Sequence, residues 1–279
     1  MAGFFGLFNY EKEGPGIEKN APKKKTFLVF FETFFRNFWK FISINIVYNL
    51  ISIPVITNGF ACVGITNVTR NIARDKHSFG LSDFFETIKK NWKQALGAGI
   101  INTLVVFVLV FDIWFFYNQD SESMLFTVLL GITFGLCVLF AMMNFYIWTL
   151  MITFDFSLKQ IYLNSFKFVV INLKNNFFCM LSLIAVYALY VGVAVLFFKD
   201  LLYVLMIEAL VYILTYPAFK FLLIQFFVFP SIKKHIIDPY YAAHPDEDLE
   251  KRRNLGIEID EQPDQEENDV SLNQDNIGD

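Results

Sequence analysis

The sequence has little charge and few of the side chains on which soluble enzymes and metalloproteins depend. Only 18% of its 279 residues are Asp, Glu, Lys or Arg, and it contains three cysteines and three histidines. The cysteines lie in apolar stretches without CxxC or Cys/His spacing, which supports neither a disulfide framework nor a zinc site. We expect Cys62, Cys137 and Cys179 to be small core residues.

Catalytic motifs are also missing from the chain. It has no glycine-rich phosphate loop, no HExxH, no GxSxG and no paired carboxylates on a recognisable loop. The sequence therefore predicts a protein that is not an enzyme and that takes no cofactor and no metal. Nucleic acid is not an expected partner.

Apolar residues are abundant instead. They make up 55% of the chain, Phe alone supplies 35 residues, and the mean hydropathy is +0.45. This composition excludes a disordered, collagen-like or coiled-coil chain and predicts a membrane protein whose partner is the lipid bilayer. Four runs reach the length of about 20 residues that a spanning helix needs. They are residues 93–117, 124–152, 177–198 and 201–229.

A shorter apolar pair precedes these four runs. Residues 38–53 and 59–73 flank Pro54 in the sequence IPVITNGFACVG, which indicates a chain break. If this pair enters the membrane and returns, 21 basic residues lie on one side and one on the other, whereas a single crossing divides them 14 to 8. Because Lys and Arg accumulate in cytoplasmic segments, we predict six membrane segments with both termini cytoplasmic. The first pair is short enough to be re-entrant.

A repeated motif precedes the first two pairs. Residues 30–40 read FFETFFRNFWK, residues 84–93 read FFETIKKNWK, and residues 165–178 form a looser third copy. Each copy has apolar residues at helical spacing, which is typical of an amphipathic helix at the membrane interface. The predicted fold is an all-α, polytopic membrane bundle of three tandem units, each an elbow helix followed by a two-segment hairpin. The alternative is that aromatic and basic residues recur at any membrane entry.

The chain divides by charge into three parts. We predict a cytoplasmic N-terminal segment (1–26), a membrane domain (27–230) and an acidic cytoplasmic tail (231–279). The tail holds 5 basic and 14 acidic residues, so the rest of the chain carries 18 basic and 13 acidic residues. From about residue 246 onward it has few apolar residues, and we expect it to be disordered.

Several side chains within or beside the spans have expected positions. The four tryptophans fall near span ends, where indole rings prefer the interface: Trp39, Trp92, Trp114 and Trp148. The span amides Asn102, Asn144 and Gln225 are expected to form hydrogen bonds between helices. Pairs of small residues at four-residue spacing are expected to let helices pack closely: Ala95 and Gly99, Gly131 and Gly135, and Ala188 and Gly192.

Charged residues in the spans are the candidate site. A charge near the bilayer centre costs about 2.5–3.5 kcal/mol, so Glu208, Asp112 and Lys220 form a candidate polar site in the membrane. Asp112 and Glu208 lie at comparable depth and could share a pocket in which like-charge repulsion raises one pKa. Alternatively, a neutral Glu208 forms a hydrogen bond with a Tyr or a backbone carbonyl. Lys220 can reach toward the cytoplasmic interface beside Pro217.

The N-terminal part of the chain resembles a known family. Residues 9–16 read NYEKEGPG, and FFETFFRNFWK and SDFFETIKKNWKQ flank the Pro54 break. In these motifs the sequence resembles the YesL family of bacterial membrane proteins over roughly the first 230 residues. Members are frequently encoded beside carbohydrate uptake systems and glycoside-degrading enzymes, which implies a bacterial cell membrane location and a role in sugar acquisition. The resemblance assigns no catalytic or binding residue.

Two functions remain open from the sequence. The chain is either a non-enzymatic accessory or regulator of carbohydrate uptake that contacts a sugar transport complex, or a transporter or channel that moves a small solute by itself. The tandem hairpins and the broken first segment fit both functions. A polar cavity reaching the middle of the membrane favours the transporter, and a sealed Phe-rich core favours the accessory.

Overall fold

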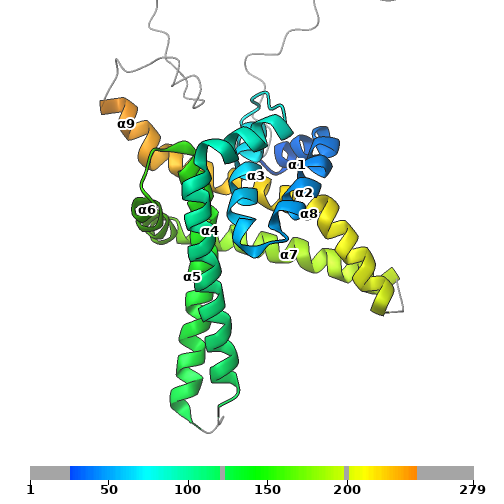
Figure 1. Cartoon of the computed structure of the whole chain (residues 1–279), viewed down its shortest axis with the longest axis vertical. Coiled ribbons are helices and arrows are strands. Elements are labelled where there is room, and N and C mark those ends of the chain that lie inside the picture. The colour runs from blue at the N-terminus through cyan, green and yellow to red at the C-terminus, as the bar shows by residue number, and fades with distance from the viewer. Residues whose placement is uncertain (1–25, 120–122, 198–200, 244–279) are drawn as a thin grey trace, which may run out of the picture.

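The computed structural model describes residues 26–119, 123–197 and 201–243, and within these ranges every regular element is a helix. Figure 1 shows the helices in space. In chain order they are α1 (Thr26–Arg36), α2 (Phe38–Ser52), the 3-10 turn η2 (Val55–Thr57), α3 (Asn58–Ala73), α4 (Leu81–Tyr117), α5 (Met124–Thr153), α6 (Leu158–Ile171), α7 (Leu173–Phe197), α8 (Leu201–Ile232), the π-helical turn η3 (Lys233–Ile237) and α9 (Asp238–Ala243).

Four of these helices, α4, α5, α7 and α8, are long and apolar enough to cross a membrane. They confirm the four spans expected from the sequence. The chain break at Pro54 is also confirmed, since α2 ends at Ser52 and α3 begins only at Asn58. With 15 and 16 residues, α2 and α3 are shorter than a full span, so the six-segment topology stays a prediction.

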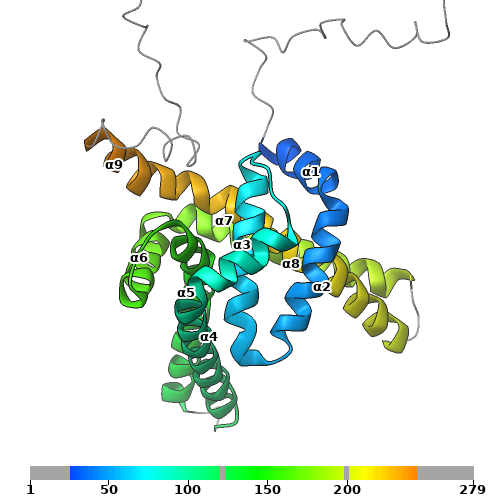
Figure 2. The same cartoon turned by 45° about the horizontal axis from the view of Figure 1, so that its top comes forward.

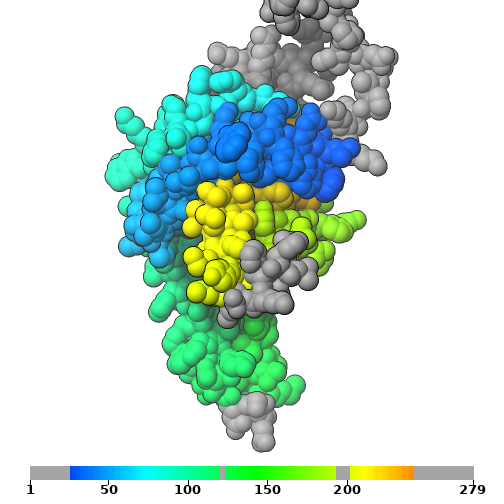
Figure 3. All heavy atoms as spheres, turned by 90° about the vertical axis from the view of Figure 1, so that its right-hand side faces the viewer, coloured from blue at the N-terminus to red at the C-terminus, as the bar shows by residue number. Residues whose placement is uncertain are grey.

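The long helices form two hairpins that diverge. Figures 1 and 2 show that α4 and α5 extend in one direction while α7 and α8 extend in another, with the α2–α3 hairpin between them. In Figure 3 the α4–α5 hairpin projects below the rest of the molecule. The three hairpins are therefore close together at one end and apart at the other.

Helix α3 lies at the centre of the packed end. It contacts α2, α4, α5 and α8, and ten of its 16 residues are buried. Its closest neighbour is α4, because a Cβ atom at Gly59 would collide with the carbonyl oxygen of Ala95 and would approach Gly99 to 3.0 Å. Glycine at this position lets the two backbones meet. The small pair Ala95 and Gly99 thus packs as expected.

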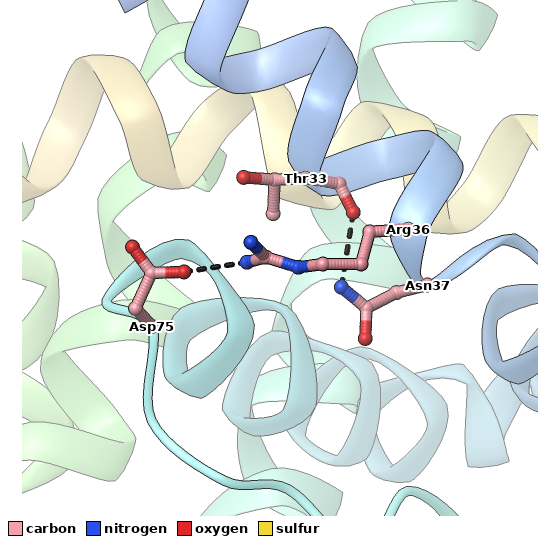
Figure 4. Close-up of polar contacts among 4 residues, drawn as sticks. All are labelled: Thr33, Arg36, Asn37 and Asp75. Atoms are coloured by element: carbon pink, nitrogen blue, oxygen red, sulfur yellow. Dashed lines mark hydrogen bonds and ion pairs between the residues drawn. The ribbon is translucent and has the colours of Figure 1, made fainter. Parts of the chain in front are cut away.

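The repeat has a physical counterpart in the structure. Phe30 and Thr33 of the first copy are buried, and so are Phe84 and Thr87 of the second. The asparagine that ends each motif donates the same hydrogen bond, from Nδ2 to the carbonyl oxygen four residues earlier, at 3.0 Å in both copies. Figure 4 shows this bond for Asn37 and Thr33. The tandem arrangement of all three units stays a prediction.

The second copy departs from the predicted elbow helix. Helices α1 and α6 are separate from the helices that follow them, whereas α4 is continuous from Leu81 to Tyr117. The first copy contains one residue more than the second, Phe38, directly after the asparagine where α1 ends and α2 begins. The second copy lacks this residue, and α4 continues through Asn91.

One further expectation needs correction, and the predicted domain boundary at residue 230 stays a prediction. Trp148 is only 5% exposed and packs inside the bundle, whereas Trp39, Trp92 and Trp114 are exposed. The helical body also continues beyond the boundary predicted at residue 230, because η3 and α9 reach residue 243 and bury Ile237 and Tyr241. The segments 1–25 and 244–279, and with them most of the predicted N-terminal and tail regions, lie outside the described residues.

Candidate functional site

The site begins at Pro217 of α8, where the helix continues but its backbone hydrogen bonding is interrupted, a feature called here the break in α8. Pro217 lies inside this helix and has no N–H to donate to the carbonyl oxygen four residues earlier. The fully buried Asn45 of α2 lies against the break: its Nδ2 donates to the Leu214 carbonyl oxygen at 2.8 Å, and its Oδ1 accepts from the Ala218 N–H at 2.7 Å. One carboxamide therefore binds both a donor and an acceptor of the interrupted helix.

A second asparagine satisfies the remaining backbone carbonyl oxygen. The carbonyl oxygen that Pro217 cannot reach belongs to Ile213, and it accepts a hydrogen bond from Nδ2 of Asn49 at 3.1 Å. Asn49 lies one helical turn after Asn45, so a single face of α2 meets the break. In an apolar environment such partners are needed because unsatisfied backbone groups are costly. The sequence singled out neither asparagine, because nothing in it says which helix lies opposite Pro217.

A cavity of about 680 Å³ opens beside this break. Its walls come from α2, α3, α4, α5, α7 and α8, so it lies between the three hairpins. Much of the lining is apolar, and the polar side chains come from several helices: Tyr48, Asn58, Asn102, Thr103, Asn144, Tyr187, Tyr216 and Lys220. The volume lies within the range of about 300–1,000 Å³ that is typical of small-molecule sites.

Lys220 is the charged residue of this cavity. It lies three residues after Pro217, is half-buried, and its Nζ lies 5.4 Å from the ring centroid of Phe221. No ion pair or hydrogen bond is formed by this ammonium group within the described part of the chain, and no carboxylate lines the cavity. The cavity wall therefore carries one uncompensated positive charge.

The amides of the cavity link the helices around it. Asn102 Nδ2 donates to Asn144 Oδ1 at 2.8 Å, and the Tyr162 hydroxyl donates to Asn102 Oδ1 at 2.8 Å. Deeper in the bundle, Gln225 Nε2 donates to Thr149 Oγ1 at 2.9 Å. These contacts confirm the predicted role of Asn102, Asn144 and Gln225 in hydrogen bonds between helices. The first two amides also line the cavity, which the sequence did not indicate.

Tyrosines of α7 and α8 form an aromatic wall. Tyr216 stacks on Tyr212 with ring centroids 5.1 Å apart, and it makes edge contacts with Tyr187 at 5.9 Å and Tyr190 at 6.2 Å. Tyr187 and Tyr216 reach the cavity. Aromatic faces, hydroxyls, amides and one ammonium group are together suited to bind a hydroxylated solute.

The structure does not bring the predicted carboxylates together. Asp112 lies near the far end of α4 and Glu208 lies in the first part of α8, and these ends belong to the two diverging hairpins (Figure 1). Neither residue lines the central cavity. Glu208 is half-buried, and its Oε1 has no hydrogen-bond partner among the described residues. Of the three predicted residues, Lys220 alone reaches the cavity.

Metal ligands do not gather in the described ranges, where no group of three His, Cys, Asp or Glu residues could hold an ion.

Residues 41–113 match a family model described as "Protein of unknown function, DUF624". The match extends from α2 to near the C-terminal end of α4 and includes Tyr48, Asn58 and Asn102 of the cavity. Neither a curated protein nor a solved structure matches the sequence.

Proposed function

We propose that the protein is a multi-pass protein of the bacterial cell membrane, related to the YesL family, that binds a small hydroxylated solute in its central cavity and moves it across the bilayer. The unpaired ammonium group of Lys220 in the cavity wall carries the proposal. A lone charge in an apolar bundle is costly and marks a functional site by default. The proposed activity is not enzymatic.

The break in α8 supports transport rather than binding alone. Secondary transporters place their solute beside helices that are interrupted near the middle of the membrane. Here Lys220 follows the interruption at Pro217 by less than one helical turn, and Asn45 holds the opened backbone. The cavity has polar side chains from several helices set in a mostly apolar wall, which supports a transporter over an accessory with a sealed core.

The proposal is tested by ligand binding to the purified full chain. A panel of neutral sugars and sugar acids is screened for an increase in thermal unfolding temperature in detergent, and hits are tested for uptake into proteoliposomes. We expect at least one sugar or sugar acid to stabilise the protein, with a preference for the acids because of the charge of Lys220. Lys220→Met should abolish both stabilisation and uptake.

The matched control is Lys167→Met, which removes an exposed lysine of α6 outside the cavity. It should bind and transport like the wild type. If no solute binds, or if Lys220→Met binds as well as the control, the cavity is not the site.

An accessory role in carbohydrate uptake is the second candidate. It is favoured by a row of exposed aromatic residues on α1 and the start of α2, where Phe27, Phe35 and Trp39 are between 66% and 79% exposed. These rings suit contact with lipid or with a sugar transport complex. Co-purification of such a complex from native membranes, together with the absence of any solute binding by the isolated protein, would favour this role over transport.

We further propose that both termini are cytoplasmic. The 21 to 1 division of basic residues supports this orientation. Single cysteines at the exposed positions Asn118 and His77, in a cysteine-free background, test it in intact cells with an impermeant reagent. Position 118 should react and position 77 should not, and the reverse result would overturn the orientation.

A further inference from the structure

A second polar site lies at the packed end of the bundle, away from the central cavity. Arg70 and Arg74 are four residues apart at the end of α3 and so share one face of the helix. Arg70 is tied into the structure, because its Nη1 donates to the Ile152 carbonyl oxygen at 3.1 Å and to Thr153 Oγ1 at 2.8 Å. It thereby satisfies a carbonyl at the C-terminus of α5. Its Nε is buried and has no partner.

The burial of Arg74 is not explained by comparable hydrogen bonds to the described residues. Its guanidinium stacks on Phe229 of α8, with the Cζ atom 3.5 Å from the ring centroid, which fixes the plane of the group. Both Nε and Nη2 are buried and make no hydrogen bond within the described part of the chain. These two nitrogens lie on the same edge of the guanidinium, the edge that binds oxyanions in a bidentate manner.

Among the described residues, no carboxylate forms an ion pair with Arg70 or Arg74. The neighbouring carboxylate, Asp75, pairs with the exposed Arg36 instead, as Figure 4 shows. Burial, followed by the charge of Arg70, lowers the pKa of Arg74 to about 9. Burial and then the charges of Arg74 and Arg70 also lower the pKa of Lys76. All three cations would therefore gain from an anion nearby.

Both arginines line a cavity of about 140 Å³. Since a water molecule takes about 30 Å³ of liquid volume, this cavity has room for a few waters or for one small oxyanion. Gln225 also lines it, and its Oε1 is buried without a partner while its Nε2 donates to Thr149 Oγ1. Rotating this amide by half a turn lets Thr149 donate to Oε1 and points Nε2 into the cavity as a further donor.

We propose that Arg70 and Arg74 bind a phosphate group in this cavity, supplied either by an anionic lipid headgroup or by free phosphate. The number and arrangement of the unpaired hydrogen-bond donors indicate which class of ligand fits. The Nε and Nη2 edge of Arg74 takes two oxygens, and Nε of Arg70 on the other guanidinium takes a third, which matches a tetrahedral oxyanion. A carboxylate offers its two oxygens in one plane and carries a single negative charge, whereas a phosphate offers oxygens in a tetrahedral arrangement and up to two charges.

The test uses the purified, delipidated full chain in mild detergent. Thermal unfolding is followed while inorganic phosphate is added, against chloride and acetate at equal ionic strength. In parallel, the chain is reconstituted in nanodiscs of phosphatidylcholine with or without phosphatidylglycerol, and retained lipid is identified by native mass spectrometry. We expect a saturable rise in unfolding temperature with phosphate if the source is free, or with phosphatidylglycerol and its retention if the source is lipid.

Variants assign the response to the site. Arg74→Gln should weaken the effective probe at least about tenfold, as expected for the loss of charge-assisted hydrogen bonds. Lys167→Gln is the control, because it removes an exposed cation of α6 that does not line this cavity, and it should respond like the wild type. Should Arg74→Gln fail to fold, Arg74→Lys keeps the charge without the bidentate edge and should bind more weakly than the wild type.

Three results would overturn the proposal. The first is that neither phosphate nor phosphatidylglycerol has an effect beyond that of chloride. The second is that acetate stabilises the protein as much as phosphate does. The third is that the folded Arg74 variant responds like the wild type. Each is readable without any knowledge of the solute that occupies the central cavity.

Discussion

Helix α3 and the α4–α5 hairpin are opposites in hydrophobicity and burial. Helix α3 is too short to meet the length of a full span, contains Asn and Thr, and has ten buried residues among its 16. The most apolar 18-residue segments of α4 and α5, by contrast, are only 11% and 6% buried inside the protein. In this chain the most hydrophobic helices are the least packed.

This contrast follows from the solvent. Lipid tails are as apolar as leucine, so long apolar helices need no protein cover, and helices pack through small residues and interhelical hydrogen bonds instead. Helix α3 has both features, with Gly59 against α4 and the hydrogen bond from Asn67 to Thr87. In α5, a Cβ added at Gly131 or Gly135 would have no neighbour within 4 Å. The same spacing of small residues therefore packs in one helix pair and does not in the other.

The largest effect is expected from Gly59→Ala. The added Cβ would collide with the Ala95 carbonyl oxygen, and because backbone cannot move aside as a flexible side chain can, we expect a loss of more than about 3 kcal/mol of unfolding free energy. Gly135→Ala is the control and should be neutral or slightly stabilising by about 0.5–1 kcal/mol, as for an open helix position. Thermal unfolding in detergent measures both. Equal effects would remove the distinction between the two regions.

A somewhat smaller loss is expected from Asn45→Ala. This change leaves the Ala218 N–H and the Leu214 carbonyl oxygen without their side-chain partner, at about 1–3 kcal/mol for each unsatisfied buried group. Asn49→Ala removes one donor from a half-buried position and should cost about 1 kcal/mol. Denaturation of the two variants side by side provides the measurement. A neutral Asn45→Ala would show that the break in α8 needs no support from α2.

Lys220→Met should separate stability from function. Because it removes an unpaired charge from the bundle, we expect unchanged or slightly higher thermal stability together with the loss of solute binding. Unfolding temperature and binding are measured on the same preparation. A marked loss of stability would instead assign Lys220 a structural role.

The smallest effect is expected at the C-terminus. Truncation after Ala243 keeps the buried Tyr241 and removes residues 244–279, which carry 13 acidic and three basic residues and have too little apolar area to offset the entropy of ordering. The unfolding temperature should stay within about one degree of the wild type, since surface changes alter stability by less than about 0.5 kcal/mol. A drop of several degrees would show that the tail packs on the helices.

Several features could be read from the sequence because they depend on local chemistry. The four spans follow from apolar length, the break follows from Pro54, and the repeated FFET motif buries equivalent Phe and Thr residues in both copies. Continuous α4 was missed, since the motif indicates helix-forming residues but does not show whether one helix ends before the next begins. Trp148 was placed at the interface from its distance to the span end, which does not reveal the helices around it.

The sequence by itself determined that this is an apolar helical membrane protein and which of its segments are long enough to span a bilayer, because both depend on composition and on 1.5 Å of rise per residue. Only the tertiary structure decided which charged residues share a site. Depth along a helix put Asp112 and Glu208 at one level, but the hairpins that carry them diverge. Lys220 instead lies in a cavity between three hairpins, and Arg74 stacks on Phe229 from a distant part of the chain in a second cavity that Arg70 also lines. These contacts depend on how the helices pack. In lipid, that packing is determined by a few small and polar residues, and the sequence alone does not show which residues they contact.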